Sequence, residues 1–215
     1  MNDKINVMIV EDQAMPRQLF ETIVRADPRL NLVVSVDNAE IADVCCLRHD
    51  VSLVLMDVVT KNGASGLSAA EKIKKINDKI KIIVVTSMPE CSYVERAESI
   101  GVEGFWYKDF GAEPIQSVIN KVLDGETSYP DAKPDVALGL AFCSDFTERE
   151  LEVLREMTGG FTNAEIAEKI NLSEKRVRNV VTDMLEKTGF RNRTELAVRA
   201  REAGIVILER KQGDI

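Results

Sequence analysis

Residues 53–57 read Leu-Val-Leu-Met-Asp, four apolar residues followed by a carboxylate. A short, continuously apolar run of this kind is typical of a strand that is buried on both faces of a parallel sheet. Similar runs, rich in Val and Ile, recur along the first half of the chain. The strands predicted from them span residues 5–10, 32–36, 53–56, 80–85 and 104–107.

Segments with helical periodicity alternate with these strands, over residues 16–26, 39–48, 67–76, 92–100 and 113–123. Five β–α units in sequence predict a doubly wound α/β domain, with a flavodoxin-like five-stranded parallel sheet in the order 2-1-3-4-5. Ligands of such domains bind at the carboxyl ends of the strands. Functional residues are therefore expected where each strand ends.

The pattern changes after residue 125. Pro130 and Pro134, together with several Asp and Gly residues, predict a linker over residues 126–145. Within it, the apolar residues 136–143 could form a short helix or pack on a neighbouring element. The rest of the chain is helical, and we expect four helices there. The predicted domains span residues 1–125 and 146–215.

The net charge is −8, which by itself argues against nucleic-acid binding, because proteins that bind DNA usually carry a basic surface. The charge is unevenly distributed, however. Residues 1–144 hold 15 basic and 22 acidic residues, whereas residues 173–201 hold eight basic and four acidic ones. The local basic excess makes residues 173–201 a candidate nucleic-acid-binding segment.

The chain has no apolar run close to the ~18–20 residues that a membrane span needs. Its four cysteines and single histidine show no metal-ligand spacing. We therefore expect free thiols, a cytoplasmic location and no membrane partner.

Polar residues stand at the ends of four predicted strands. Glu11 and Asp12 follow the first strand and Asp57 the third, whereas Thr86 ends the fourth and Lys108 the fifth. Because the first and third strands are predicted neighbours, the three carboxylates should converge, and carboxylate oxygens suit Mg²⁺. A cation, a hydroxyl and an ammonium around one carboxylate are what phosphoryl transfer to an aspartate needs. One Asp at a strand end is more often solvated, so the prediction depends on all five positions.

Residues 5–124 resemble the receiver domain of bacterial two-component response regulators, through VMIVED (7–12), LVLMD (53–57), VVTS (84–87) and GFWYKD (104–109). The resemblance implies that a cognate sensor histidine kinase phosphorylates Asp57 and that Thr86 and Lys108 contact the phosphoryl group. It also implies Mg²⁺ ligation by Glu11, Asp12, Asp57 and the backbone carbonyl of Val59. Thr86 and Phe105 would form the switch, although Phe105 could equally be a plain core aromatic.

The loop after residue 57 departs from the family pattern. Thr60 and Lys61 stand where the family commonly has Met-Pro, and Gly66 comes one position later than usual, so we expect a loop that is one residue longer. The apolar Val59 and Met88 occupy positions that typically set the rate of acyl-phosphate hydrolysis. Neither side chain can orient a water, which predicts slow self-dephosphorylation.

Residues 163–170, a turn at 171–172 and residues 173–187 have the form of a helix–turn–helix, whose second helix enters the DNA major groove. An ordinary charged surface helix is the competing interpretation. Residues 146–200 resemble the LuxR-type DNA-binding domain, through FTERELEVL (146–154), TNAEIA (162–167) and KTGF (187–190). The order receiver, linker, LuxR domain is that of the NarL/FixJ class. The predicted DNA contacts are Lys175, Arg176, Arg178, Asn179 and Thr182.

Two positions in this segment differ from the usual pattern: Val180 replaces a His, and Asp183 adds a negative charge. Both predict a sequence preference unlike that of well-known relatives. The fourth helix, around Leu196, Ala197 and Ala200, is the usual dimer surface of the class, but these residues could equally be core.

The resulting hypothesis is a phosphorylation-controlled transcription regulator that binds promoter DNA as a homodimer, with RNA polymerase as a candidate partner. Its chemistry would be limited to its own phosphorylation and slow dephosphorylation. A haloacid-dehalogenase-type enzyme also forms a phosphoaspartate, but it needs a second Asp where this chain has Val59. A phosphorylation-independent scaffold remains an alternative.

Overall fold

The computed structural model describes residues 4–90, 92–109, 113–131 and 134–206. The chain forms two compact units. Of the described residues, unit 1 holds 4–87, 94–109 and 113–131, and unit 2 holds 88–90, 92–93 and 134–206. Each unit has a hydrophobic core of its own.

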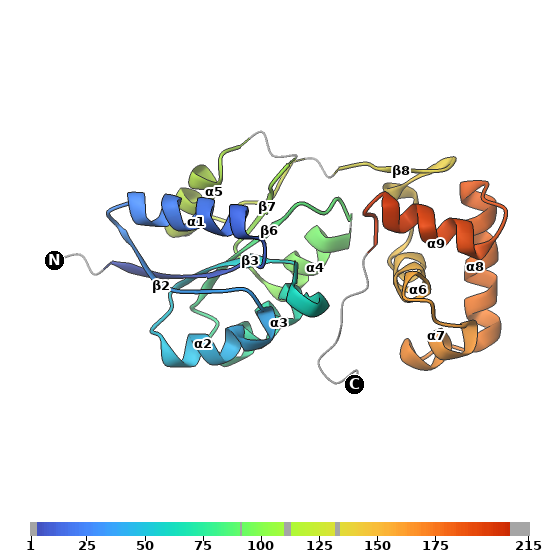
Figure 1. The fold of residues 1–215 in the computed structure, drawn as a ribbon, viewed down its shortest axis with the longest axis horizontal. Coiled ribbons are helices and arrows are strands. Elements are labelled where there is room, and N and C mark those ends of the chain that lie inside the picture. The colour runs from blue at the N-terminus through green and yellow to red at the C-terminus, as the bar shows by residue number, and fades with distance from the viewer. Residues whose placement is uncertain (1–3, 91, 110–112, 132–133, 207–215) are drawn as a thin grey trace. The chain divides into compact units, whose positions relative to one another are not determined.

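Unit 1 is built on a five-stranded parallel sheet (Figure 1). Its order, β2-β1-β3-β6-β7, is the predicted 2-1-3-4-5. All five residues of β3 are buried, which explains why this strand is continuously apolar up to Asp57. The strands are β1 (Ile5–Val10), β2 (Leu30–Val36), β3 (Leu53–Asp57), β6 (Lys81–Thr86) and β7 (Gly104–Tyr107).

Helices cover both faces of this sheet (Figure 1). On one face, α1 (Ala14–Ala26) and α5 (Ile115–Leu123) pack on alternate residues of β1, β3 and β6. The other face carries α2 (Ala42–Arg48), α3 (Gly66–Ile76) and α4 (Ser92–Ile100). The predicted helix over residues 39–48 begins as a 3-10 turn, η1 (Ala39–Ile41).

The longer loop after β3 forms a small hairpin. Strand β4 (Val59–Thr60) pairs antiparallel with β5 (Ala64–Ser65), and the turn η2 (Lys61–Gly63) joins them. Asn62 has φ 63° and Gly63 has φ 76°, while the Ala64 N–H donates to the Lys61 carbonyl. Two central residues with positive φ characterise the type I′ turn, for which Asn-Gly is a preferred pair.

Four helices form the main part of unit 2: α6 (Glu148–Thr158), α7 (Asn163–Lys169), α8 (Glu174–Thr188) and α9 (Arg193–Glu202). Capping boxes begin α6, through Thr147 and Glu150, and α7, through Thr162 and Glu165, and the Ser173 hydroxyl accepts from the Arg176 N–H at the start of α8. Gly189 ends α8 with φ 74°, a left-handed conformation that a side chain would strain.

The apolar residues 136–143 form a hairpin, which sequence patterns left undecided. Strands β8 (Ala137–Leu138) and β9 (Ala141–Phe142) precede a 3-10 turn, η3 (Cys143–Asp145). Leu138, Ala141 and Cys143 are buried in the same core as the four helices. Part of the predicted linker 126–145 thus packs in unit 2. The limits of the two predicted domains, residues 1–125 and 146–215, stay predictions.

Helix α9 contributes to the core of unit 2. Leu196 and Ala200 are fully buried there, and Ala197 packs against the same core. For Leu196 and Ala200 the structure therefore decides between dimer surface and core in favour of core. Val198, 49% exposed, is an apolar residue that α9 offers to solvent.

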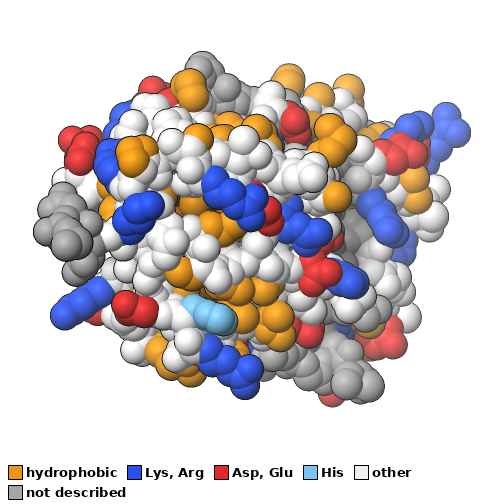
Figure 2. Space-filling view, turned by 60° about the vertical axis from the view of Figure 1, so that its left-hand side comes forward, with side chains coloured by type: hydrophobic (Ala, Val, Ile, Leu, Met, Phe, Trp, Pro, Cys, Tyr) orange, Lys and Arg blue, Asp and Glu red, His pale blue; other side chains and the backbone are white. Residues whose placement is uncertain are grey.

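The molecular face in Figure 2 carries basic and acidic side chains that are interspersed rather than gathered by sign. Hydrophobic side chains reach this surface at several places. Large exposed apolar residues of unit 1 include Met15, Leu19, Ile41, Val44, Leu47 and Ile76. Among the described residues, the helices are too short or too polar to cross a membrane.

Candidate functional site

The carboxyl ends of three strands place one cation between two carboxylates. Glu11 directly follows β1, Asp57 ends β3 and Lys108 directly follows β7. The Lys108 Nζ lies 2.5 Å from Glu11 Oε2 and 3.1 Å from Asp57 Oδ2. Glu11 is fully buried and Asp57 is 5% exposed, so this is a nearly solvent-free cluster.

A third carboxylate adjoins this pair. Ligand oxygens of Glu11, Asp12 and Asp57 all lie within 4.8 Å of one another. Three carboxylates with one ammonium leave an excess of negative charge, which a divalent cation with oxygen ligands would neutralise. The donor set therefore fits Mg²⁺. This acidic pocket is typical of a magnesium site.

Electrostatics make the Asp57 carboxylate unusual. Burial raises the pKa of Asp57 from about 3.8 to about 7, Lys108 opposes this increase, and Glu11 adds to it. The Val58 N–H also donates to Asp57 Oδ1 at 2.8 Å, which favours the charged form. The pKa of Asp12 is raised by burial and then by Glu11. Such perturbed carboxylates are common at functional sites.

The two predicted switch residues lie on neighbouring strands. Thr86 ends β6, one residue beyond the register partner of Asp57, and it is 1% exposed. Its carbonyl accepts from the Lys108 N–H at 2.8 Å. Phe105 on β7 is 2% exposed and packs edge-on against Tyr107, with ring centroids 4.9 Å apart. The inward position of Phe105 is compatible with both a switch and a core role.

In unit 2, α7 and α8 form the predicted helix–turn–helix. The turn passes through Asn171, which has φ 55°. One side of α8 packs inward through its apolar residues, including Val180 at 7% exposure. Val180, which replaces the usual His, is therefore a core residue in this chain, whereas Asp183 is exposed. The five predicted DNA contacts, Lys175, Arg176, Arg178, Asn179 and Thr182, are all exposed.

Two basic residues of the segment 173–201 serve internal contacts instead. The Lys187 Nζ lies 2.8 Å from both carboxylate oxygens of Glu150, which also caps α6. Arg193 donates to the Phe161 carbonyl at 2.6 Å and to Asn163 at 3.1 Å. The basic excess that faces solvent is therefore smaller than the composition of the segment indicates.

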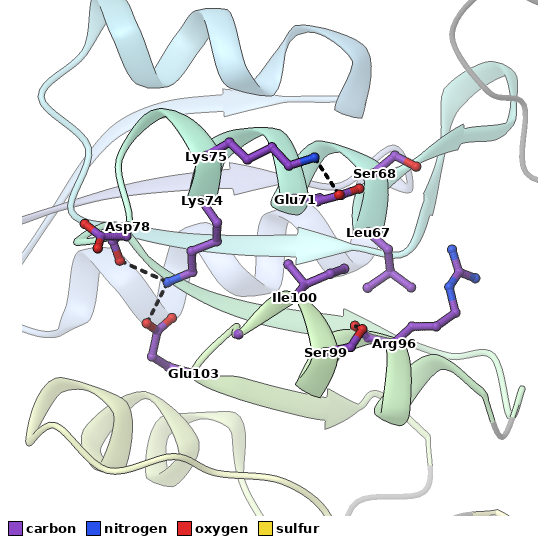
Figure 3. A pocket seen from close by; sticks show the side chains of 11 residues that line it. Leu67, Ser68, Glu71, Lys74, Lys75, Asp78, Arg96, Ser99, Ile100 and Glu103 are labelled. Carbon is purple, nitrogen blue, oxygen red and sulfur yellow. Dashed lines mark hydrogen bonds and ion pairs between the residues drawn. The ribbon is translucent and has the colours of Figure 1, made fainter.

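A wide groove of about 640 Å³ lies between α3 and α4, away from this chemistry (Figure 3). Lys74 donates to Glu103 at 2.6 Å, and Lys75 pairs with Glu71 at 2.6 Å. The groove contains none of the predicted receiver-site residues. Because its lysines already have carboxylate partners, we assign the function to the strand ends.

Comparisons with known proteins agree with this geometry. A model of the "Response regulator receiver domain" matches residues 7–120, and a model of "Bacterial regulatory proteins, luxR family" matches residues 144–200. The chain belongs to the response regulator family. Its domain order is that of a two-component response regulator with a LuxR-type DNA-binding domain, a transcription regulator rather than a conventional enzyme.

Similar full-length regulators come from Bacillus subtilis (strain 168). The transcriptional regulatory protein DesR is 29% identical, over 93% of this chain and 98% of DesR. The uncharacterized transcriptional regulatory protein YxjL is 30% identical, over 95% of this chain and 98% of YxjL.

Solved structures of the response regulator RcsB share the fold. RcsB from Salmonella enterica serovar Typhimurium, bound to promoter rprA with the phosphomimetic BeF3−, superposes with a TM-score of 0.60. That match is 20% identical and covers 93% of this chain and 99% of RcsB. Another structure holds two RcsB dimers on two parallel DNAs, with a TM-score of 0.59 at 18% identity, covering 93% of this chain and 98% of that one.

Sequence patterns placed Gly66 and Thr60 in the longer loop, but they did not show how these two residues shape the pocket. An ideal Cβ on Gly66 would lie 1.8 Å from the Asp57 carbonyl oxygen, so only glycine fits there. Thr60 is 2% exposed and hydrogen-bonded in the loop beside Asp57. The dipeptide Asn62-Gly63 is the signal that could have revealed this loop, because Asn-Gly strongly favours a tight hairpin turn.

Proposed function

We propose that Asp57 is the phosphoacceptor of this response regulator and that its phosphorylation controls dimerisation, DNA binding and transcription. The contact of Lys108 with both Asp57 and Glu11, at 3.1 and 2.5 Å, is the observation that carries the proposal. It places a fixed positive charge beside the carboxylate that would receive the phosphoryl group.

In the proposed reaction, an Asp57 carboxylate oxygen attacks the phosphorus of a phosphohistidine on a sensor kinase. The new O–P bond forms as the N–P bond breaks, and the leaving imidazole takes up a proton. Lys108 neutralises charge on the phosphoryl oxygens, and Thr86 donates a hydrogen bond to one of them. Glu11, Asp12, Asp57 and the Val59 carbonyl would hold Mg²⁺, which supplies further charge neutralisation when bound.

The switch would couple this chemistry to the rest of the chain. Thr86 and Phe105 are both buried and lie on the adjacent strands β6 and β7. Movement of Thr86 toward the phosphoryl group would leave space for the Phe105 ring, which shifts the balance between two arrangements of the receiver.

On unit 2, we assign DNA contact to the exposed face of α8. Arg178 can bind guanine with two hydrogen bonds and Asn179 can do so with adenine, whereas Lys175 and Arg176 suit phosphate oxygens. Arg178 is paired with Glu174 at 2.9 Å, so this ion pair has to open or be shared when Arg178 meets a base. The Thr182 hydroxyl donates to the Arg178 carbonyl and can still accept a hydrogen bond.

Promoter DNA and a sensor histidine kinase are the proposed partners, with RNA polymerase as a further candidate. The RcsB dimers on DNA support a homodimer as the DNA-bound form. Among the described cysteines, Cys45, Cys46 and Cys143 are free thiols, which supports a cytoplasmic location; Cys91 lies outside the described residues.

Phosphorylation by a small-molecule phosphodonor tests the phosphoacceptor. We expect the wild-type chain to show a phosphate-dependent gel shift that needs Mg²⁺ and is absent from Asp57→Asn. A shift that persists in Asp57→Asn would contradict the assignment. Lys108→Met serves as the second variant, because it keeps the acceptor and removes the cation.

Selected-site DNA binding by the wild type, Asp57→Ala and a phosphorylated sample tests whether phosphorylation controls DNA binding. We expect phosphorylation to raise the affinity and Arg178→Ala to weaken binding in a salt-dependent manner. Equal binding by all Asp57 forms would favour the phosphorylation-independent scaffold.

A further inference from the structure

We propose that Thr60 is a positioning residue for the divalent-cation site, because its buried hydroxyl anchors the hairpin that carries the Val59 carbonyl. This inference rests on the proposed function, in which the acidic pocket holds Mg²⁺. It concerns the loop in which this chain departs from its family, with Thr60-Lys61 at the positions of the common Met-Pro.

The Val59 carbonyl makes no hydrogen bond to the opposite strand of the hairpin, so it is free to bind a partner outside the hairpin. Val59 is paired with Ser65, and the neighbouring Gly66 N–H donates to the Val58 carbonyl at 2.7 Å. Hydrogen-bonded and non-hydrogen-bonded pairs alternate along an antiparallel ladder, so Val59–Ser65 is a non-hydrogen-bonded pair. The Val59 carbonyl therefore points away from β5, as a metal ligand should.

The Thr60 hydroxyl fixes this hairpin to another part of unit 1. It accepts from the Ala39 N–H at 2.8 Å and donates to the Ala64 carbonyl at 3.3 Å. Ala39 begins η1, whereas Ala64 belongs to the opposite strand of the hairpin. One hydroxyl that is 2% exposed thus connects both hairpin strands to the segment that follows β2.

The other end of the hairpin is fixed at the phosphoacceptor itself. Gly66 lies against the Asp57 carbonyl, where a Cβ would come within 1.8 Å. A nearby surface pair, Lys61 with Asp37 at 3.1 Å, is 60% and 45% exposed, so it contributes little. Thr60 and Gly66 therefore anchor the segment that contains Val59, beside a longer backbone bond from the Lys61 N–H to the Asp37 carbonyl at 3.4 Å.

This arrangement can replace the stiffness that a proline supplies. A proline ring restricts the backbone covalently, whereas Lys61 does not. Without the Thr60 bridge, the hairpin would gain conformational freedom, and cation binding would have to order it again. Residues that orient a metal ligand typically change metal affinity about tenfold or more when they are removed.

Calorimetric titration of the full chain with Mg²⁺ alone tests the inference. Thr60→Val keeps the side-chain shape and removes the hydroxyl, and we expect it to bind Mg²⁺ about tenfold more weakly than the wild type. Thr60→Ser keeps the hydroxyl, and we expect it to restore most of the affinity. Thr22→Val is the matched control, because it removes a hydroxyl bond within α1, from Thr22 to the Gln18 carbonyl.

Each variant is titrated below the temperature at which its receiver begins to unfold, so that lost stability does not imitate lost affinity. A folded Thr60→Val that binds Mg²⁺ as tightly as the wild type would overturn the role of Thr60. Equal weakening by Thr60→Ser would also overturn it, because the hydroxyl would then not matter. If the wild type itself bound no Mg²⁺, the proposed metal site would fall together with this inference.

Discussion

The buried carboxylate of Asp57 should destabilise the receiver in the absence of a divalent cation. Asp57 is 5% exposed, and burial raises its pKa from about 3.8 to about 7 despite the contact with Lys108. A pKa increase of that size corresponds to about 4 kcal/mol of unfavourable free energy for the ionised form in the folded state, as an upper limit. The substitution Asp57→Asn removes this charge and keeps the shape.

One effect reduces the expected gain. An Asn at this position still has a buried amide to satisfy, whereas the contact with Lys108 is already contained in the pKa of about 7. Lys108 does not become an unpaired charge, however, because Glu11 remains 2.5 Å from its Nζ. We therefore expect Asp57→Asn to be about 2 kcal/mol more stable than the wild type at about pH 8.

The sign of the pH dependence is specific. A folded-state pKa above the unfolded value means that folded Asp57 keeps its proton to higher pH than unfolded Asp57 does. Its contribution therefore favours the folded state at low pH, and it is lost as the pH rises from about 4 to about 7. Between about pH 8 and pH 5.5 this contribution changes by about 2 kcal/mol, so the stability gap between Asp57→Asn and the wild type should be close to zero near pH 5.5.

Urea unfolding in the presence of a chelator measures this gap. The only tryptophan of the chain, Trp106, lies on β7 and packs against Phe20, so its fluorescence reports on unit 1. Asp27→Asn is the control of opposite sign, because Arg29 lowers the pKa of Asp27 to about 2. That variant should lose stability at neutral pH, and the loss should diminish only as the pH falls below about 4.

The reasoning would be refuted if Asp57→Asn were no more stable than the wild type at about pH 8, or if the gap widened on acidification. Addition of Mg²⁺ gives a second check. It should stabilise the wild type through binding to the folded state and leave Asp57→Asn nearly unchanged.

Three further predictions concern other contacts. Glu150→Gln should lower the stability of unit 2 by about 2 kcal/mol, because it weakens the pair with Lys187, and an unchanged thermal transition in circular dichroism would contradict this. Glu174→Gln should raise DNA affinity by a few fold at low salt, because it releases Arg178 and removes a negative charge. Fluorescence anisotropy measures this affinity, and Glu202→Gln, which opens the pair with Arg199 on α9, is the control. The double variant Val59→Asn with Met88→Glu should shorten the phosphate lifetime about tenfold or more, since it supplies polar groups that can orient a water, and an unchanged decay of the phosphorylated band would exclude slow hydrolysis by this mechanism.

Much of the receiver was predictable because its signals are local. A strand buried on both faces must be apolar at every position, so β3 is recognisable without its neighbours. The carboxyl ends of parallel strands lie at one edge of a sheet, and this placed Glu11, Asp57 and Lys108 together before any contact was known. Capping boxes are equally local, since Thr147 and Glu150 are three residues apart.

Other features depended on contacts between distant residues. Residues 136–143 are apolar, but only the tertiary structure shows that they pair as a hairpin and pack on the helices of unit 2. A short apolar segment has no periodicity that distinguishes a hairpin from a short helix.

By itself, the amino-acid sequence determined the positions of the strands and helices and the chemical groups at the strand ends, because backbone preference and burial periodicity are written within a few residues. The tertiary structure alone decided which charged side chains are available for binding a partner. Lys187 lies in the basic segment, but its ammonium group is paired with Glu150, 37 residues away. Likewise, the Thr60 hydroxyl meets Ala39 across 21 residues. Such pairs follow from the way the chain returns on itself, which no local pattern records.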